Sequence, residues 1–383
     1  MSYEIAYLTS KDPLDKNESS GIYYYQSAAL KKYCGNVHYI GPVKNLLITI
    51  IIKISNFLNR FTSKKYNHSH SIIISWIYGI IFSRKLGKKK YDFVFAEKSS
   101  CEIAFLKTKL PVIYSTDATF NLLHNYYSNY SNLFRFSERE GNYIEQKAIN
   151  QASLIICSSR WAAMSVSRDY NFPPEKVSII PRGANIDIIP GREKILKKRK
   201  TDVCRLLFIG RDWHRKGFDI AYEAMDYIRA LGFKVRLIAV GCSPPSEYID
   251  KDVEVITYIN KNSGEGKKQF DEIMFNSDFF LLPVRAECLA VAFCESAAYG
   301  LPVISRDTGG IKEVVVNGVT GYILKYDASP RDFAEKIIEL YNSDEKYYKL
   351  ISSSRDFFEK RLNWDAWGRD MKNTIDNYFL KKD

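Results

Sequence analysis

Residues 286–324 read AECLAVAFCESAAYGLPVISRDTGGIKEVVVNGVTGYIL, and this stretch decides the fold class. The apolar run 279–282 before it predicts a strand, and the small apolar residues after the first glutamate predict a loop that opens into a helix. The turn at 300–302 ends that helix, 303–305 is the next strand, and the glycine turn at 308–310 is expected to begin another helix. This alternation is typical of an open α/β sheet, in which ligands bind at the carboxyl ends of the strands.

Two carboxylates and a glycine turn make this stretch a candidate ligand site. Glu287 and Glu295 stand eight positions apart, and a small, apolar segment separates them. The turn at Gly309 and Gly310 favours an anion, because free N–H groups and the helix dipole both point toward a ligand at a helix N-terminus. Taken singly, a carboxylate near a helix start can also simply complement the dipole.

A basic turn, GRDWHRKG at 210–217, follows a predicted strand at 205–209 and opens a predicted helix at 218–231. Its cations, Arg211 and Lys216 among them, suit a phosphate or diphosphate, because Arg presents a planar fork and Lys a point charge. The turn has neither the P-loop nor the GxGxxG pattern, which disfavours dinucleotide redox chemistry. A solvated basic turn is an equal alternative for this segment alone. Taken together, however, the turn and the two carboxylates match a nucleoside-diphosphate sugar. The cations suit its diphosphate, and the two carboxylates can accept hydrogen bonds from the hydroxyls of the two sugars that flank it.

Composition limits the classes of protein. The chain of 383 residues, 46% hydrophobic and 26% charged, is long enough for two globular domains. Its formal net charge of +12 favours an anionic partner, whether nucleic acid, a phosphorylated substrate or an anionic membrane surface. Seven scattered cysteines without a CxxC pair predict free thiols in a reducing cytosol. We expect no signal peptide, and no apolar run approaches the roughly 20 residues of a spanning helix.

Strands and helices alternate in both halves of the chain. The strands expected in the first half lie at 4–9, 37–40, 93–96, 112–115, 154–157 and 177–180. A Pro-Gly pair and the charge run EKILKKRK then mark a linker at 186–201, whose charges are expected to be solvated. The alternation restarts after it. Two parallel, doubly wound domains are therefore predicted, at 1–187 and 188–363, with the last helix, at 364–383, completing the first domain.

Four features of the chain outside the 286–324 stretch and the basic turn carry further candidates. The first strand's loop ends at Gly21, and Asp117 follows the strand at 112–115, where it is either catalytic or a helix cap. The region 43–90 combines apolar stripes with Lys and Arg, which predicts contact with a membrane surface or, alternatively, a solvated basic face. Asp250 and Asp252 form a DxD pattern, but it precedes a strand, so we expect no metal there.

These motifs resemble those of the retaining glycosyltransferases of family 4, which share the two-domain GT-B fold. The family's Glu-x7-Glu segment is matched by Glu287 and Glu295, and its glycine–arginine turn with a lysine five residues later by Arg211 and Lys216. Its Gly-Gly turn, its N-terminal glycine loop at Gly21 and a His or Asp near the reacting sugar, here Asp117, are matched as well. Where relatives often have Phe-Gly after the first Glu, this chain has Cys-Leu.

The resemblance implies a retaining, metal-independent transfer from a UDP- or GDP-sugar, with no cofactor. Arg211 and Lys216 would hold the diphosphate and stabilise the leaving group's charge. The backbone amides of Leu289, Ala290 and Val291 would assist them. Glu295 would accept hydrogen bonds from the ribose. The same resemblance implies that the Gly21 loop lies beside the diphosphate.

The remaining implied roles concern the transferred sugar and the acceptor. Glu287 would contact the donor sugar and help to align it, and Asp117 would position the sugar or the acceptor. We expect a cytoplasmic enzyme, peripheral on the inner face of the cell membrane, with a lipid-linked glycan of a bacterial surface polysaccharide as acceptor. Another GT-B activity, such as a sugar-nucleotide epimerase, is an alternative. Nucleic-acid binding is disfavoured, because no helix-turn-helix, zinc-finger or RNP motif is present.

Overall fold

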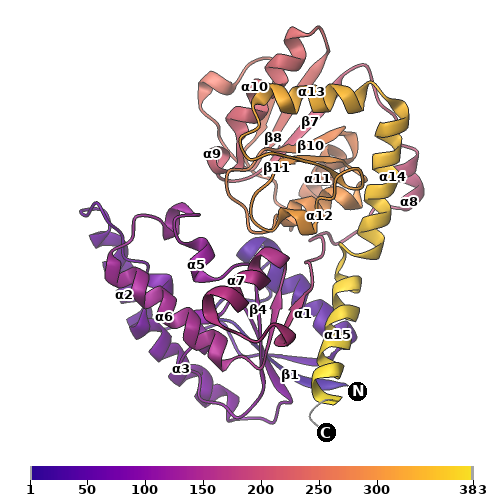
Figure 1. Cartoon of the computed structure of the whole chain (residues 1–383). Helices are drawn as coiled ribbons and strands as arrows, with labels where there is room; N and C mark the ends of the chain where they lie inside the picture. Colours follow the sequence, from indigo (N-terminus) through magenta and orange to yellow (C-terminus); the bar gives the residue numbers. More distant parts are fainter. Residues whose placement is uncertain (1, 381–383) are drawn as a thin grey trace. The chain divides into compact units, whose positions relative to one another are not determined.

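The computed structural model describes residues 2–380, which form two compact units. Of the described residues, unit 1 comprises 2–181 together with 367–380, and unit 2 comprises 182–366. Each unit is built on a six-stranded sheet in which every pair of neighbouring strands is parallel (Figure 1). The predicted fold class of two doubly wound α/β domains is thereby confirmed.

The sheet of unit 1 winds outward in both directions from its first strand. In spatial order its strands are β2 (Gly35–Tyr39), β1 (Tyr3–Leu8), β3 (Phe93–Glu97), β4 (Val112–Thr116), β5 (Leu154–Cys157) and β6 (Val177–Ile179). The central strands β3, β4 and β5 are buried at every position, because helices cover both faces of a parallel sheet. Strand β1 pairs with β2 on one side and β3 on the other, so the winding direction reverses between β1 and β3.

Several helices of unit 1 begin at a polar residue whose side chain caps the first turn. The helices of this unit are α1 (Ile22–Tyr33), α2 (Leu46–Leu58), α3 (Ile72–Leu86), α4 (Ser100–Ile103), α5 (Phe120–Leu123), α6 (Arg135–Gln151), α7 (Arg160–Tyr170) and α15 (Trp364–Leu380). Asn45, Ser71 and Ser159 cap α2, α3 and α7, each accepting a hydrogen bond from a first-turn amide. From residue 367 onward α15 belongs to unit 1, where the buried Trp367 ring lies 6.2 Å from that of Phe95.

Unit 2 repeats the winding. Its strands, in spatial order, are β12 (Gly321–Leu324), β11 (Val303–Arg306), β10 (Phe279–Leu282), β7 (Cys204–Ile209), β8 (Val235–Val240) and β9 (Val253–Ile256). Its helices are α8 (Arg192–Leu196), α9 (Trp213–Lys216), α10 (Phe218–Ala230), α11 (Gly264–Asn276), α12 (Val291–Ala298), α13 (Pro330–Tyr341) and α14 (Asp344–Lys360). Here the direction reverses between β7 and β10.

Two expectations are wrong. Only a single 3₁₀ turn, Ile311–Glu313, follows the glycine turn instead of a helix, because three β-branched valines and an Asn-Gly turn follow at once. The charge run in the linker is not wholly solvated either. Lys198 is buried, and its Nζ donates a hydrogen bond to the backbone carbonyl of Ser277. The chain re-enters the domain there, and the buried ammonium finds a carbonyl acceptor.

Candidate functional site

The candidate site of unit 2 lies where its sheet reverses direction. The loops after β7 and β10 meet there, because these two strands are neighbours and parallel. The first loop contains the basic turn, and the second contains Glu287. Ligands of open α/β sheets bind at such a switch point, outside the carboxyl ends of the strands.

Glu287 is the centre of a buried ion-pair cluster. Its Oε2 accepts hydrogen bonds from Lys216 Nζ at 2.5 Å and from Arg215 Nη1 at 3.2 Å. Burial raises the pKa of Glu287, but the charges and hydrogen bonds of Lys216 and Arg215 outweigh it, so the pKa lies below its ordinary value. The carboxylate is therefore ionised at neutral pH. Its presence keeps two cations together at the carboxyl end of β7.

Close backbone packing holds the two loops together. Gly217 has φ 80°, and a Cβ there would lie 2.1 Å from the carbonyl oxygen of Pro283, so only glycine fits. Arg285 forms a two-pronged ion pair with Asp219, at 2.8 and 2.5 Å, and also donates to the backbone carbonyl of His214. These contacts fix the loop of Glu287 against the loop of Lys216.

The second glutamate has its own cation. Glu295 is buried on α12, and its Oε1 accepts a hydrogen bond from Lys261 Nζ at 2.8 Å. Lys261 Nζ also lies 4.1 Å from the centre of the Phe270 ring, a cation–π contact. Glu295 is therefore held on the buried side of α12 by a lysine that follows β9.

The helix that begins between the two glutamates has no side-chain cap at its start. Ala290 is the N-cap of α12 and supplies no side-chain cap to its first amides, which include Val291. The amide of Gly310 donates to the carbonyl of Cys288 at 2.9 Å, so the glycine turn braces the loop that contains Leu289. Gly309 has φ 53°, in the left-handed region.

The N-terminal glycine loop of unit 1 lies at the corresponding reversal point of its own sheet. Gly21 has φ 85° and is the N-cap of α1, directly after Ser19 and Ser20, which also have positive φ. Nearby, the buried Gln26 links the first and third strands, accepting from Tyr7 at 2.8 Å and donating to Glu97 at 2.8 Å. Buried hydrogen bonds therefore connect β1 and β3, the two strands between which the sheet of unit 1 reverses direction.

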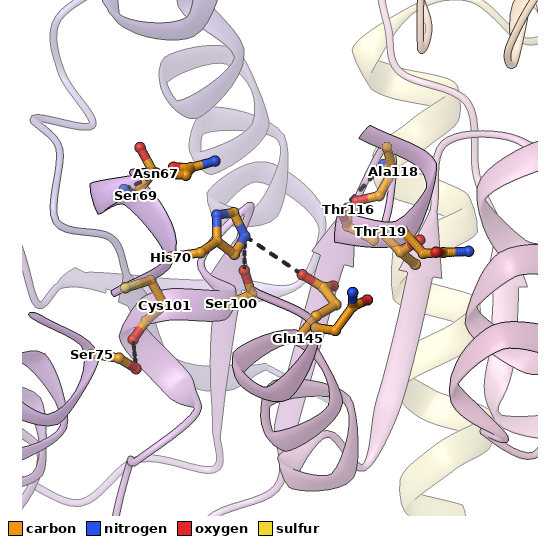
Figure 2. Close-up of polar contacts among 12 residues, drawn as sticks. Asn67, Ser69, His70, Ser75, Ser100, Cys101, Thr116, Ala118, Thr119 and Glu145 are labelled. Atoms are coloured by element: carbon orange, nitrogen blue, oxygen red, sulfur yellow. Dashed lines mark hydrogen bonds and ion pairs between the residues drawn. The ribbon is translucent and has the colours of Figure 1, made fainter. Parts of the chain in front are cut away.

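Asp117 lies on the loop after β4, with a cation beside it. Its Oδ2 lies 2.8 Å from Nζ of Lys98, which follows β3 and has φ 49°. A positive φ is costly for a lysine, and such strain is concentrated at functional sites. Thr116 Oγ1 donates to the carbonyl of Ala118 at 2.7 Å and closes the turn that presents Asp117 (Figure 2).

A buried polar cluster around His70 packs against the start of the helix that follows this loop. His70 Nε2 lies 3.4 Å from Ser100 Oγ and 3.9 Å from Glu145 Oε2 (Figure 2). The His70 ring also packs on Phe120, with ring centroids 4.9 Å apart, and Phe120 begins the helix that follows the Asp117 loop. The cluster is buried, so we assign it a structural role rather than a catalytic one.

Other sequence candidates have structural explanations. Asp250 and Asp252 both accept hydrogen bonds from Arg229, at 2.8 and 3.0 Å, and they precede β9. Within residues 2–380, no cluster of three or more His, Cys, Asp or Glu side chains has the geometry of a metal site. All seven cysteines lie in this range, and they are buried and form no disulfide. None of the helices described is long and apolar enough to cross a bilayer.

Comparison with known proteins identifies the class. Residues 52–188 match the family described as Glycosyltransferase Family 4, and residues 204–343 match the glycosyl transferases group 1 family. HepE of Anabaena, solved in complex with UDP and glucose, has the same fold, with a TM-score of 0.64 and 15% identity over 98% of this chain and 100% of that one. The two family matches and the fold thus define a glycosyltransferase of the GT-B type. More narrowly, the chain belongs to glycosyltransferase family 4.

Two curated relatives extend the comparison. An uncharacterized glycosyltransferase of Methanocaldococcus jannaschii is 27% identical over 234 residues, which are 59% of this chain and 60% of the relative. The lipopolysaccharide 1,2-N-acetylglucosaminetransferase of Salmonella typhimurium is 24% identical over 253 residues, 61% of this chain and 64% of the relative. Both matches span less than two thirds of the relatives' own length.

Three cations that pair with candidate residues, two in unit 2 and one in unit 1, had no individual role in the sequence prediction. Arg215 contacts Glu287, whereas Arg211, predicted for the diphosphate, is exposed. Lys261 pairs with Glu295, and Lys98 pairs with Asp117. Arg215 stands in the basic turn already singled out, so its charge was a usable signal. Lys98 and Lys261 follow other strands than their partners Asp117 and Glu295. They come close to those carboxylates only because of the order of the strands in each sheet.

Proposed function

We propose that this protein transfers a hexose-type sugar, with retention of anomeric configuration, from a nucleoside-diphosphate sugar to a glycan acceptor. The observation that carries the proposal is the buried Glu287 held by Lys216 and Arg215 at the reversal point of unit 2. Two cations beside the amides of a helix N-terminus suit a diphosphate. The structure of HepE with UDP and glucose supports a nucleotide-sugar donor.

The diphosphate and the two sugars of the donor would contact different residues of the site. Its diphosphate would meet Lys216, with Arg211 from the same turn and the amides of Leu289 to Val291, and these groups would stabilise the charge that grows on the leaving phosphate. The ribose hydroxyls would donate to Glu295, and the sugar hydroxyls to Glu287. Because side-chain cations do this work, the transfer needs no metal ion.

Retention would follow from attack on the same face as the departing phosphate. The acceptor hydroxyl would lose its proton to a leaving-phosphate oxygen as the new glycosidic bond forms, and the nucleoside diphosphate would depart. Asp117 would position the sugar or the acceptor hydroxyl, and the ion pair with Lys98 would orient that carboxylate. The Gly21 loop would leave room for the diphosphate.

We further propose that the acceptor is a lipid-linked oligosaccharide of a bacterial surface polysaccharide. The similarity to the Salmonella lipopolysaccharide transferase supports this acceptor class. Such an acceptor is anchored in a bilayer, so the enzyme would act in the cytoplasm at the inner face of the cell membrane. The basic, apolar region 43–90 is the part of the chain suited to that location.

A thermal-shift screen of UDP- and GDP-sugars tests the donor, because a bound ligand raises the midpoint of unfolding. Lys216→Met should abolish the shift and lower turnover roughly 100- to 1,000-fold. The matched control is Lys234→Met, since Lys234 is also ion-paired, with Asp202 at 2.7 Å, but on the surface of unit 2. Full turnover in Lys216→Met would refute the site. Conversion of the donor without any acceptor would indicate an epimerase instead.

A further inference from the structure

The outer face of α2 is apolar and exposed. Its large side chains with 42–74% of their surface exposed are Leu46, Leu47, Ile50, Ile54, Phe57 and Leu58, and we call these six the α2 outer face. The spacing of Leu46, Ile50, Ile54 and Phe57, four or three residues apart, aligns them in one row along the helix. A water-facing helix normally presents polar residues in such a row, so this face is fitted for an apolar medium.

The opposite side of α2 explains why the helix is ordered. Ile48 is buried with Ile74 and Cys101 in a small apolar cluster, and Ile51 and Ile52 pack against it. Asn45 caps the helix start, accepting from the amide of Ile48 at 3.1 Å. The helix is therefore held on unit 1 through its inner side, next to the other helices of that unit (Figure 1).

The sequence segment that contains α2 has charges of one sign only. Residues 19–91 contain twelve Lys and Arg and no Asp or Glu, whereas the rest of the chain contains 44 of each kind. The whole formal charge of +12 therefore resides in this segment. Lys53 is exposed on α2 and lies at one edge of the apolar row, and the exposed Arg60 follows the end of the helix. Lys44 precedes the helix, and Lys64 and Lys65 follow it.

We infer that the α2 outer face docks this protein on an anionic lipid bilayer, with the six apolar side chains entering the acyl boundary and the flanking cations binding lipid phosphates. An apolar row bordered by Lys and Arg is the pattern of a helix that lies in the plane of the interface. An anionic leaflet attracts each nearby cation, which matches the single sign of charge. A protein partner of equal affinity would have to supply both an apolar groove and several carboxylates.

The inference rests on the proposed function, because it names the surface by which the enzyme would reach a membrane-anchored acceptor. Vesicle binding nevertheless requires neither donor nor acceptor, so the two can fail separately. A protein that binds vesicles but consumes no nucleotide sugar would support the docking surface and refute the transferase. A transferase that is active on a water-soluble acceptor but binds no vesicles would refute the docking surface alone.

Cosedimentation of the full chain with vesicles tests the surface. The probe is phosphatidylcholine with about one-third phosphatidylglycerol, against pure phosphatidylcholine. Ile54→Glu with Phe57→Glu should lower the bound fraction at least about ten-fold. The matched control is Ile188→Glu with Leu231→Glu, two apolar side chains of unit 2 that are 78% and 63% exposed, and it should bind like the unchanged protein.

A charge variant keeps the test decisive if the apolar variant folds poorly. Lys53→Glu with Arg60→Glu changes only exposed polar positions, and it should lower binding to the anionic vesicles about ten-fold at low salt. Equal binding to both vesicle types, or undiminished binding by both variants, would overturn the inference. So would a dimer that dissociates in the Ile54/Phe57 variant while vesicles are never bound, because the face would then be an interface between two copies.

Discussion

Lys198→Met should change the stability of unit 2 in a way that depends on pH. Lys198 is buried, and its Nζ donates to the carbonyl of Ser277, next to the carboxylate of Asp278. Burial lowers the pKa of Lys198 from 10.5 to about 8, and the nearby Asp278 only partly offsets this. Methionine matches the lysine side chain up to its last atom and removes the charge, so the substitution reports chiefly the cost of burying an ammonium.

The magnitude follows from linkage. A fall from 10.5 to about 8 is about 2.5 pKa units, or about 3 kcal/mol at 1.36 kcal/mol per unit. Below pH 8 both states hold the proton, and the folded protein bears the full cost. Between pH 8 and 10.5 the unfolded chain still binds the proton that the folded chain has released, so the folded state gains stability as the pH rises. Relative to Lys198→Met, the unchanged protein should therefore gain about 3 kcal/mol from pH 7 to pH 10.5.

Urea unfolding of both proteins at several pH values between 7 and 10.5 measures this difference. Taking the difference between the two proteins removes the contributions of the cysteines and tyrosines, which titrate in the same range in both. The transition of unit 2 should be fitted separately, because a two-domain chain need not unfold in one step. A difference that is flat across the window would show that the Lys198 ammonium remains hydrated, and the reasoning from burial would be refuted.

Three further predictions concern the candidate site. Glu295→Gln should weaken binding of UDP at least about ten-fold by titration calorimetry, because a carboxylate acceptor for the ribose and the partner of Lys261 are both lost; unchanged affinity would remove Glu295 from the nucleotide site. Lys98→Met should lower kcat about 10- to 100-fold and leave the KM for the donor unchanged, since Asp117 loses the cation that orients it; a change in donor KM alone would contradict this. His70→Ala should lower the free energy of unfolding of unit 1 by about 2–4 kcal/mol, because a buried ring is deleted, and an unaltered thermal midpoint would contradict that packing role.

The sequence was most informative where one segment carries its own signal. The run at 279–282 is a strand as predicted, because four buried apolar residues between turns have few alternatives. The glycine turn at 308–310 misled the prediction of a helix, since the valines after it favour extended backbone. Lys198 could not be recognised as buried, because its neighbours in the run are charged and exposed. Burial there depends on Ser277, which is distant in sequence.

Helix α15 has a consequence for the biosynthesis of the protein. It starts in unit 2 at Trp364 and ends in unit 1, where Tyr3 donates to Asp376 at 2.8 Å and stacks on Phe379. Strand β1 therefore leaves the ribosome long before helix α15, against which it packs. Unit 1 cannot complete its packing until the segment from residue 367 onward has been synthesised, whereas unit 2 is continuous and can fold earlier. A premature stop after residue 366 would therefore damage the domain that was synthesised first and spare the one synthesised last.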